Sequence, residues 1–200
     1  MKHVNEFIEF ALSHAKKSSV PSGAKLAYPV GTKGEWEYLY GTTGKKCTTS
    51  LLTKKYNTFY SRNNWSRTSY NAATRGWVER GVIVCDCQGL EDYFSNSDTN
   101  AKGNYANYCT QKGETSKIKR DYVIGEAVFK GNTPSRINHV GWICGFMPDG
   151  EPLVVEEKGL SYGCVVTKLS ATKWTYRGLM TKRYRYDSVE VSKPEVFTFN

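Results

Sequence analysis

The stretch Gly81-Val-Ile-Val-Cys-Asp-Cys-Gln-Gly-Leu90 joins an apolar run to a cysteine that stands close to a glycine, and the expected fold is organised around it. The apolar residues predict a buried strand, and Gln88-Gly-Leu-Glu-Asp-Tyr-Phe94 predicts the first turns of a helix. The unpaired N–H groups and the dipole at a helix N-terminus favour negative charge, and a thiol reacts as its thiolate. Cys87 is therefore the predicted nucleophile of a site between a strand and a helix.

A cysteine nucleophile needs a base, and histidine is scarce in this chain. His3 and His14 belong to the first predicted helix. The remaining histidine, His139, lies near the start of Asn138-His-Val-Gly-Trp-Ile-Cys-Gly145, a strand-like run. His139 is therefore the predicted base.

A third polar group is needed to orient the imidazole ring. The turn at Pro148-Asp-Gly150 predicts a hairpin that pairs Leu153-Val-Val-Glu156 with the strand near His139. This pairing brings Glu156 close to the imidazole across the ladder. Glu157 lies on the opposite face of the same strand, so the choice between the two carboxylates depends on the strand register.

The length of 200 residues suits one domain with a sizeable core. Apolar spacing predicts helices over residues 3–16, 48–60 and 105–109, and the polar residues 61–80 predict a surface excursion. Alternating runs predict strands at residues 127–129, 140–146, 153–156, 163–167 and 183–186. We therefore expect a single α+β catalytic domain, helical over about residues 1–110 and a small antiparallel β-sheet over about residues 111–190, with the N-terminal helices packed on the sheet.

The formal net charge of +9 and the pI near 9.2 favour a polyanionic partner. Nucleic acid, an anionic membrane surface and a bacterial cell-wall polymer all have this chemistry. Because the Lys and Arg residues are scattered along the sequence rather than gathered into blocks, we expect no nucleic-acid partner. Met1 to Phe10 lacks the apolar core of a signal peptide, and no later run approaches membrane-spanning length, so we expect neither a signal peptide nor a membrane span.

The six cysteines are too sparse to predict a disulfide scaffold, so we expect reduced and mostly buried thiols. Cys85 and Cys87 form a C-x-C pair with no second pair at metal spacing, which is a poor zinc signature. We therefore expect no metal and no other cofactor. Cys85, Cys144 and Cys164 occupy apolar strand positions and are predicted core thiols, whereas the role of Cys109 stays open.

The blocks around these residues resemble the signature blocks of the NlpC family of cell-wall cysteine peptidases. Asp86-Cys-Gln-Gly-Leu90, His139-Val-Gly141 and Val154-Val-Glu-Glu-Lys-Gly159 occur in the family's order of cysteine, histidine and polar residue. Gly125-Glu-Ala-Val-Phe129 is similar to the family's approach to the histidine strand, and Tyr38-Leu-Tyr-Gly41 is similar to an upstream block whose tyrosine lines the active site. The resemblance implies a compact papain-like α+β fold.

The resemblance also implies an activity, which is hydrolysis of amide bonds in peptidoglycan stem peptides, commonly between D-glutamate and the diamino acid that follows it. Carried over by position, it makes Cys87 the nucleophile, His139 the general base, Glu156 the orienting residue and Tyr38 a substrate-side or oxyanion contact. Asp86 and Gln88, which flank the nucleophile, are the further candidates for substrate contacts.

The chain departs from the family pattern at three positions. Gln88 replaces the usual serine after the cysteine, and Glu37 stands where proline is usual. The third catalytic residue is acidic, where many members have histidine. The first departure leaves the helix N-terminus intact, because backbone N–H groups are present whatever the side chain.

The basic charge fits an anionic wall. The missing signal peptide and the missing wall-binding repeat resemble a phage or prophage endolysin, or a similar lysis or tail-associated enzyme. Such a protein is made in the cytoplasm and acts on the cell wall after release or injection. We expect a monomer whose partners are peptidoglycan stem peptides and the anionic wall. Two alternatives remain open: an N-acetylmuramyl-L-alanine amidase or acyltransferase on the same Cys-His frame, and a non-catalytic basic domain that binds cell wall or nucleic acid.

Overall fold

The central element of the fold is β7 (His139–Phe146), in a computed structural model that describes residues 1–187 and 197–198. One edge of β7 pairs with β8 (Pro152–Glu157) through the predicted hairpin. The other edge pairs with β6 (Ala127–Lys130) and then with β1 (Lys25–Leu26). All three pairings are antiparallel, so the strand that carries the predicted base lies inside the sheet.

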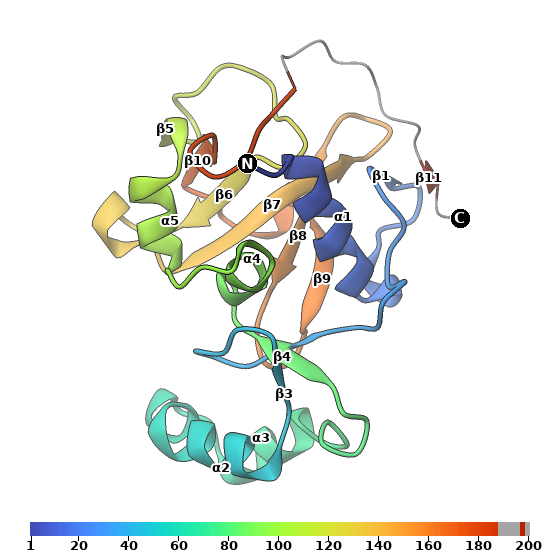
Figure 1. Cartoon of the computed structure of the whole chain (residues 1–200), viewed down its shortest axis with the longest axis vertical. Coiled ribbons are helices and arrows are strands. Elements are labelled where there is room, and N and C mark those ends of the chain that lie inside the picture. Colours follow the sequence, from blue (N-terminus) through green and yellow to red (C-terminus); the bar gives the residue numbers. More distant parts are fainter. Residues whose placement is uncertain (188–196, 199–200) are drawn as a thin grey trace.

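The main sheet has the order β11-β1-β7-β6-β10-β5, and β8 continues it through β9 on the other side of β7 (Figure 1). Its remaining strands are β5 (Thr110–Glu114), β9 (Cys164–Lys168), β10 (Tyr176–Leu179) and β11 (Phe197–Thr198). A second, small sheet has the order β2-β4-β3, with β2 parallel and β3 antiparallel to β4. Its strands are β2 (Glu37–Tyr38), β3 (Lys45–Lys46) and β4 (Ile83–Cys85).

Helix α1 (Val4–His14) covers one face of the main sheet, as Figure 1 shows. Its apolar residues recur at helical spacing, so one stripe of the helix is buried against the strands. Phe7 is fully buried and meets the ring of Trp142 on β7 edge to face, with 4.9 Å between the ring centroids. The helix begins with a capping box in which the Glu6 carboxylate accepts the N–H of His3 at 2.7 Å.

All five α-helices precede β5 in the sequence. Helices α4 (Gly89–Ser95) and α5 (Ala101–Asn107) follow β4, and α4 packs beside α1. Four short 3₁₀ helices are η1 (Lys17–Ser19), η2 (Tyr60–Asn63), η3 (Pro134–Arg136) and η4 (Leu169–Ala171). Within residues 1–187 and 197–198, no helix combines the length and the apolar character needed to cross a membrane.

Helices α2 (Thr49–Thr58) and α3 (Arg67–Ala73) lie below the small sheet in Figure 1, away from the main sheet. They pack on a hydrophobic cluster that includes Tyr60, Tyr70 and Trp77 and, from the small sheet, Val84. Most of residues 61–80 are exposed, as expected of a surface excursion, but the segment also forms a helix and buries Tyr70 and Trp77. The apolar residues there are few and widely spaced, so the local pattern does not reveal that three aromatic rings share one cluster.

The strands predicted at residues 127–129, 140–146, 153–156 and 163–167 are confirmed as β6, β7, β8 and β9. The strand predicted at residues 183–186 is wrong, because this segment turns and contributes only a single bridge, between Arg185 and His3. Strand β10 was not predicted because Arg177 interrupts its apolar pattern, although Arg177 is buried and pairs with Glu126 at 2.6 Å. The last residues of the predicted sheet part, 188–190, lie outside the described residues.

Candidate active site

Cys87 lies in the turn that connects β4 to the start of α4. The Asp86 carboxylate accepts the backbone N–H of Gln88 at 3.1 Å and that of Gly89 at 2.7 Å, which is the pattern of an N-terminal cap. The backbone carbonyl of Asp86 accepts the N–H of Leu90 at 3.3 Å and closes the turn. The sequence therefore places the cysteine between strand and helix as expected, with the preceding aspartate as the cap.

The Cys87 sulfur contacts the backbone on both sides of His139. Sγ lies 3.9 Å from the carbonyl oxygen of Asn138, and the backbone N–H of Val140 also points to the sulfur. These two residues flank His139 at the start of β7. The predicted nucleophile and the predicted base, which are 52 positions apart in the sequence, are thus brought to one place by the packing of α4 on the sheet.

His139 is held by two neighbours. Its Nε2 lies 2.7 Å from Oε2 of Glu156, and its ring stacks on Trp174 with 5.5 Å between centroids and 15° between planes. A carboxylate has no proton to donate, so Nε2 carries the hydrogen of the neutral ring. Nδ1 is therefore the ring nitrogen with a free lone pair, which a base needs.

Glu156 is the carboxylate that faces His139, which resolves the register question. It is fully buried, and its Oε1 accepts a hydrogen bond from the Thr167 hydroxyl at 2.8 Å. Glu157 points to the opposite face and accepts a contact from the Cys85 thiol at 3.2 Å. Complete burial raises the pKa of Glu157 well above its usual range, so that this carboxyl group is neutral. Each carboxylate oxygen of Glu156 has a hydrogen-bond partner.

Gly141 leaves the space that Glu156 needs to reach the imidazole. A Cβ atom at this position would lie 2.5 Å from Cγ1 of Val154 and 3.2 Å from both Cβ of Glu156 and the Trp174 ring. We expect Gly141→Ala to destabilise the fold by about 1–3 kcal/mol through overpacking, measured by urea unfolding. Gly113→Ala is the matched control, because its Cβ would meet nothing closer than 3.7 Å. Equal stability of the two variants would contradict the close packing at Gly141.

The resting state of Cys87 is a thiol. Burial, and second the nearby charge of Asp86, raise its pKa to about 12, although backbone N–H groups of Val140, Gln88 and Cys87 act in the opposite direction. The N–H groups at the start of α4 act in the direction expected of a helix N-terminus. Helix α4 has only seven residues, and its N–H groups do not outweigh the burial of the sulfur.

Alkylation of Cys87 by iodoacetamide tests this protonation state. With the pKa near 12, the rate is expected to rise about tenfold per pH unit from pH 7 to pH 10 without reaching a plateau. Cys87 is 8% exposed and the other five cysteines are 3% exposed or less, so it is the thiol that reacts first. Mass spectrometry of peptides gives the site, and Cys87→Ala is the control. A plateau near neutral pH would indicate a preformed thiolate.

Tyr38 lies near Cys87, the predicted nucleophile. It pairs with Cys85 in the small sheet, and its hydroxyl has no hydrogen-bond partner among residues 1–187. Burial, followed by the charges that Cys87 and Asp86 can carry, raises its pKa, so the phenol stays protonated and is a hydrogen-bond donor at neutral pH.

The expectation that the Asp86 and Gln88 side chains contact substrate is not supported by their positions. Both oxygens of Asp86 are occupied, because the carboxylate also accepts the N–H of Gly41 at 2.9 Å. Gln88 is 3% exposed, and its amide bonds Glu91 at 2.8 Å and Asn104 at 3.0 Å. The two side chains support the loop of Cys87 from within, because a buried amide must have its donors and acceptors satisfied.

A cleft of about 870 Å³ lies beside His139, although neither His139 nor Cys87 lines it. Asn138 and Trp174 form the wall that it shares with the site. Its lining also includes three basic residues, Lys130, Arg136 and Lys173, and one acidic residue, Glu114. The structure therefore offers a broad, positively charged surface on one side of the imidazole.

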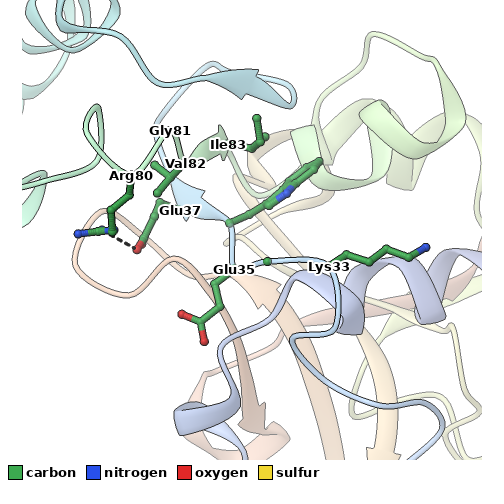
Figure 2. Close-up of a pocket in the computed structure, with 9 residues that line it drawn as sticks. Lys33, Glu35, Glu37, Arg80, Gly81, Val82 and Ile83 are labelled. Atoms are coloured by element: carbon green, nitrogen blue, oxygen red, sulfur yellow. Dashed lines mark ion pairs between the residues drawn. The ribbon is translucent and has the colours of Figure 1, made fainter.

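A second cleft, of about 470 Å³, is separate from these residues. Figure 2 shows that its wall carries Lys33, Glu35, Glu37 and Arg80, with Arg80 directed toward Glu37. Its two basic and two acidic residues give the lining no net charge. Its lining contains neither Trp174, which stacks on His139, nor Asn138, which contacts the Cys87 sulfur, so we assign it no part in the site.

Sequence reasoning missed Trp174 and Thr167. Trp174 belongs to no recognised block, and only the tertiary structure places its ring on His139. Thr167 could have been found from the pairing of β9 with β8. In this register Thr167 lies opposite Val154, and it is therefore a diagonal neighbour of Glu156 on the same face of the sheet. His3 and His14 are occupied elsewhere, with Asp187 and with the carbonyl of Gly34.

All six cysteines are free and buried. Among the described residues, no group of three or more His, Cys, Asp or Glu side chains is arranged to hold a metal ion. Comparison of the chain with protein-family models, with curated proteins and with solved structures finds no match.

Proposed function

We propose that this chain is a cysteine peptidase with a papain-like frame that hydrolyses amide bonds of peptidoglycan stem peptides. The observation that carries the proposal is the position of the Cys87 sulfur against the backbone on both sides of His139, whose Nε2 is bonded to buried Glu156. Thiol-dependent amide hydrolysis uses a nucleophile, a base and an orienting group in this arrangement. The resemblance to the NlpC family supports the D-glutamyl bond to a diamino acid as the bond cleaved.

The reaction begins with the thiol. Nδ1 of His139 accepts the thiol proton while the Cys87 sulfur attacks the carbonyl carbon, and the negative charge moves to the carbonyl oxygen. The imidazolium then donates its proton to the leaving nitrogen as the C–N bond breaks, which leaves a thioester on Cys87. Water attacks the thioester with His139 as base, the carboxylate product leaves, and the proton returns to the sulfur.

Two donors near the sulfur suit the oxyanion of this intermediate. The backbone N–H of Cys87 lies beside the sulfur, and the protonated hydroxyl of Tyr38 has no partner among the described side chains. Donors that are already in place act strongly in a site that excludes water. Glu156 has a different role, because it orients the imidazole and stabilises its positive charge.

The basic cleft supports a substrate that carries carboxylates. Among residues 1–187, none of Lys130, Arg136 and Lys173 has a carboxylate within salt-bridge distance. The stem peptides of peptidoglycan carry free carboxylates, which such side chains recognise. We further propose a phage-type lytic setting, in which a monomer made in the cytoplasm reaches the wall after release or injection.

Digestion of purified peptidoglycan, followed by mass spectrometry of the products, tests this function. We expect new amino and carboxyl termini within the stem peptides, and no products with Cys87→Ala. Cleavage between the glycan and the first alanine would indicate the amidase alternative. Transfer of an acyl group to an added amine would indicate an acyltransferase. Identical profiles with and without the thiol would overturn the enzymatic proposal.

A further inference from the structure

The positive charge of the chain is concentrated in one region, residues 41–82, which we name the helical module. These 42 residues contain eight Lys and Arg and a single acidic residue, Glu79, for a net charge of +7. The other 158 residues carry a net charge of only +2. The Lys and Arg residues themselves are spread along the chain, but the near absence of acidic residues from the module leaves one part of the molecule strongly basic.

The helical module is a separate structural part. It contains β3, α2, η2 and α3, and in Figure 1 its two α-helices lie beyond the small sheet, far from the main sheet. Its residues form most of a second hydrophobic cluster, which Leu39, Val84 and Leu160 complete from outside the module. Helix α2 has no fully buried residue and α3 has one, Tyr70, so most of their polar surface faces solvent.

The cations of the module are largely unneutralised. Within the described part of the chain, only Arg80 has a carboxylate partner, Glu37 at 4.0 Å (Figure 2). Lys55 donates to the carbonyl of Gly41, and the Arg67 guanidinium covers the ring of Tyr56. Seven of the eight side chains belong to exposed residues: Lys45, Lys46, Lys54, Arg62, Arg67, Arg75 and Arg80. Like charges at this density repel one another, and an external anion relieves the repulsion.

The module is joined directly to the loop of the nucleophile. Gly41 donates its N–H to the Asp86 carboxylate at 2.9 Å, and its carbonyl accepts Lys55 Nζ at 2.7 Å. The backbone N–H of Asp86 donates to the carbonyl of Thr42 at 2.9 Å. A polymer bound to the module is therefore held next to the residues around Cys87.

We propose that the helical module is a docking surface for a phosphodiester-linked anionic polymer of the cell wall. The cations are spread along two helices and their connections rather than gathered in a pocket, which fits a repeating anion better than a small ligand. The proposal rests on the proposed function, because it is the link to the Cys87 loop that favours a wall polymer over nucleic acid. The polymer raises the local concentration of enzyme and takes no part in bond cleavage.

The test compares two triple charge reversals in a Cys87→Ala background, which prevents digestion. The module variant is Lys54→Glu, Arg62→Glu and Arg75→Glu, and the matched control is Lys33→Glu, Lys102→Glu and Lys182→Glu. All six side chains are exposed, and none has a side-chain hydrogen bond within residues 1–187. The two variants therefore have the same net charge, and circular dichroism verifies that each is folded.

Binding is measured by cosedimentation with insoluble walls, before and after hydrofluoric acid removes the phosphodiester-linked polymers. We expect the module variant to lose at least about 10-fold in affinity for intact walls, and the control to stay within about twofold. Removal of the polymers is expected to abolish the difference between the variants. Equal losses in both, or no loss in the module variant, would overturn the proposal. Tighter binding of the parent to a DNA duplex than to walls at equal salt would assign the surface to nucleic acid instead.

The same reversals in the protein with Cys87 intact separate docking from catalysis. Hydrolysis of a small soluble muropeptide is expected to stay within about twofold in the module variant, whereas lysis of intact walls falls. If the parent does not hydrolyse the muropeptide, the proposed function fails, and the docking proposal is still judged by sedimentation. If both activities fall equally, the charges act in the catalytic groove and not in docking.

Discussion

Replacement of Cys87 by serine, or of His139 by alanine, is expected to reduce hydrolysis of a soluble muropeptide by at least about 10³-fold. A hydroxyl group is less acidic than a thiol, and the imidazole is the group that can accept the proton which burial keeps on the sulfur. His3 and His14 cannot take its place, because they are bonded to Asp187 and to the carbonyl of Gly34.

A double variant and a control variant make this prediction specific. The double variant is expected to be no less active than either single variant, because nucleophile and base act as one unit and their losses do not add. Cys109→Ala serves as the control, since Cys109 is buried and, within residues 1–187, its sulfur has a single hydrogen-bond partner, Asn104 at 3.9 Å. Substantial activity in a folded His139→Ala protein would contradict the pairing of this histidine with Cys87.

Glu156→Gln is expected to lower kcat/KM by about tenfold, and Glu156→Ala by about 10² or more. The amide oxygen of glutamine can still accept from Nε2 of His139, and its NH₂ group can donate to the Thr167 hydroxyl in place of the present bond at 2.8 Å. The orientation of the ring is then retained, while the charge that stabilises the imidazolium is lost. Alanine removes both effects and leaves Nε2 without its partner.

Glu157→Gln is the matched control for this series. Burial keeps the Glu157 carboxyl group neutral, so an amide of the same shape is a close substitute beside Cys85. We expect little change in kcat/KM and in the midpoint of urea unfolding. If Glu157→Gln proves damaging while Glu156→Gln is silent, the carboxylate that orients His139 has been misidentified.

Much of the site was predictable because its residues lie in segments with strong local patterns. Cys87 follows an apolar strand and precedes a helix, and the hairpin turn at residues 148–150 places β8 beside β7. The pairing of the two strands leaves only Glu156 or Glu157 as the neighbour of His139, and the register decides between them. Local periodicity and turn chemistry were sufficient for these elements.

The remaining features depend on partners that are distant in the sequence. Strand β10 escapes prediction because Arg177 is buried only through its ion pair with Glu126, 51 residues earlier. The amide of Gln88 was expected at the substrate, yet Asn104 and the first turns of α4 enclose it. The protonation state of Cys87 depends on how deeply the sulfur is buried, and no local pattern gives that burial.

The most direct test of the account is to trap the acyl-enzyme. The protein is mixed with a soluble muropeptide, quenched in acid within the first turnover, and examined by intact-mass and peptide mass spectrometry. The account predicts a mass increase equal to the acyl part of the substrate on the peptide that contains Cys87, and no adduct in Cys87→Ala. Turnover with no adduct on Cys87, or with an adduct on another residue, would contradict Cys87 as the nucleophile.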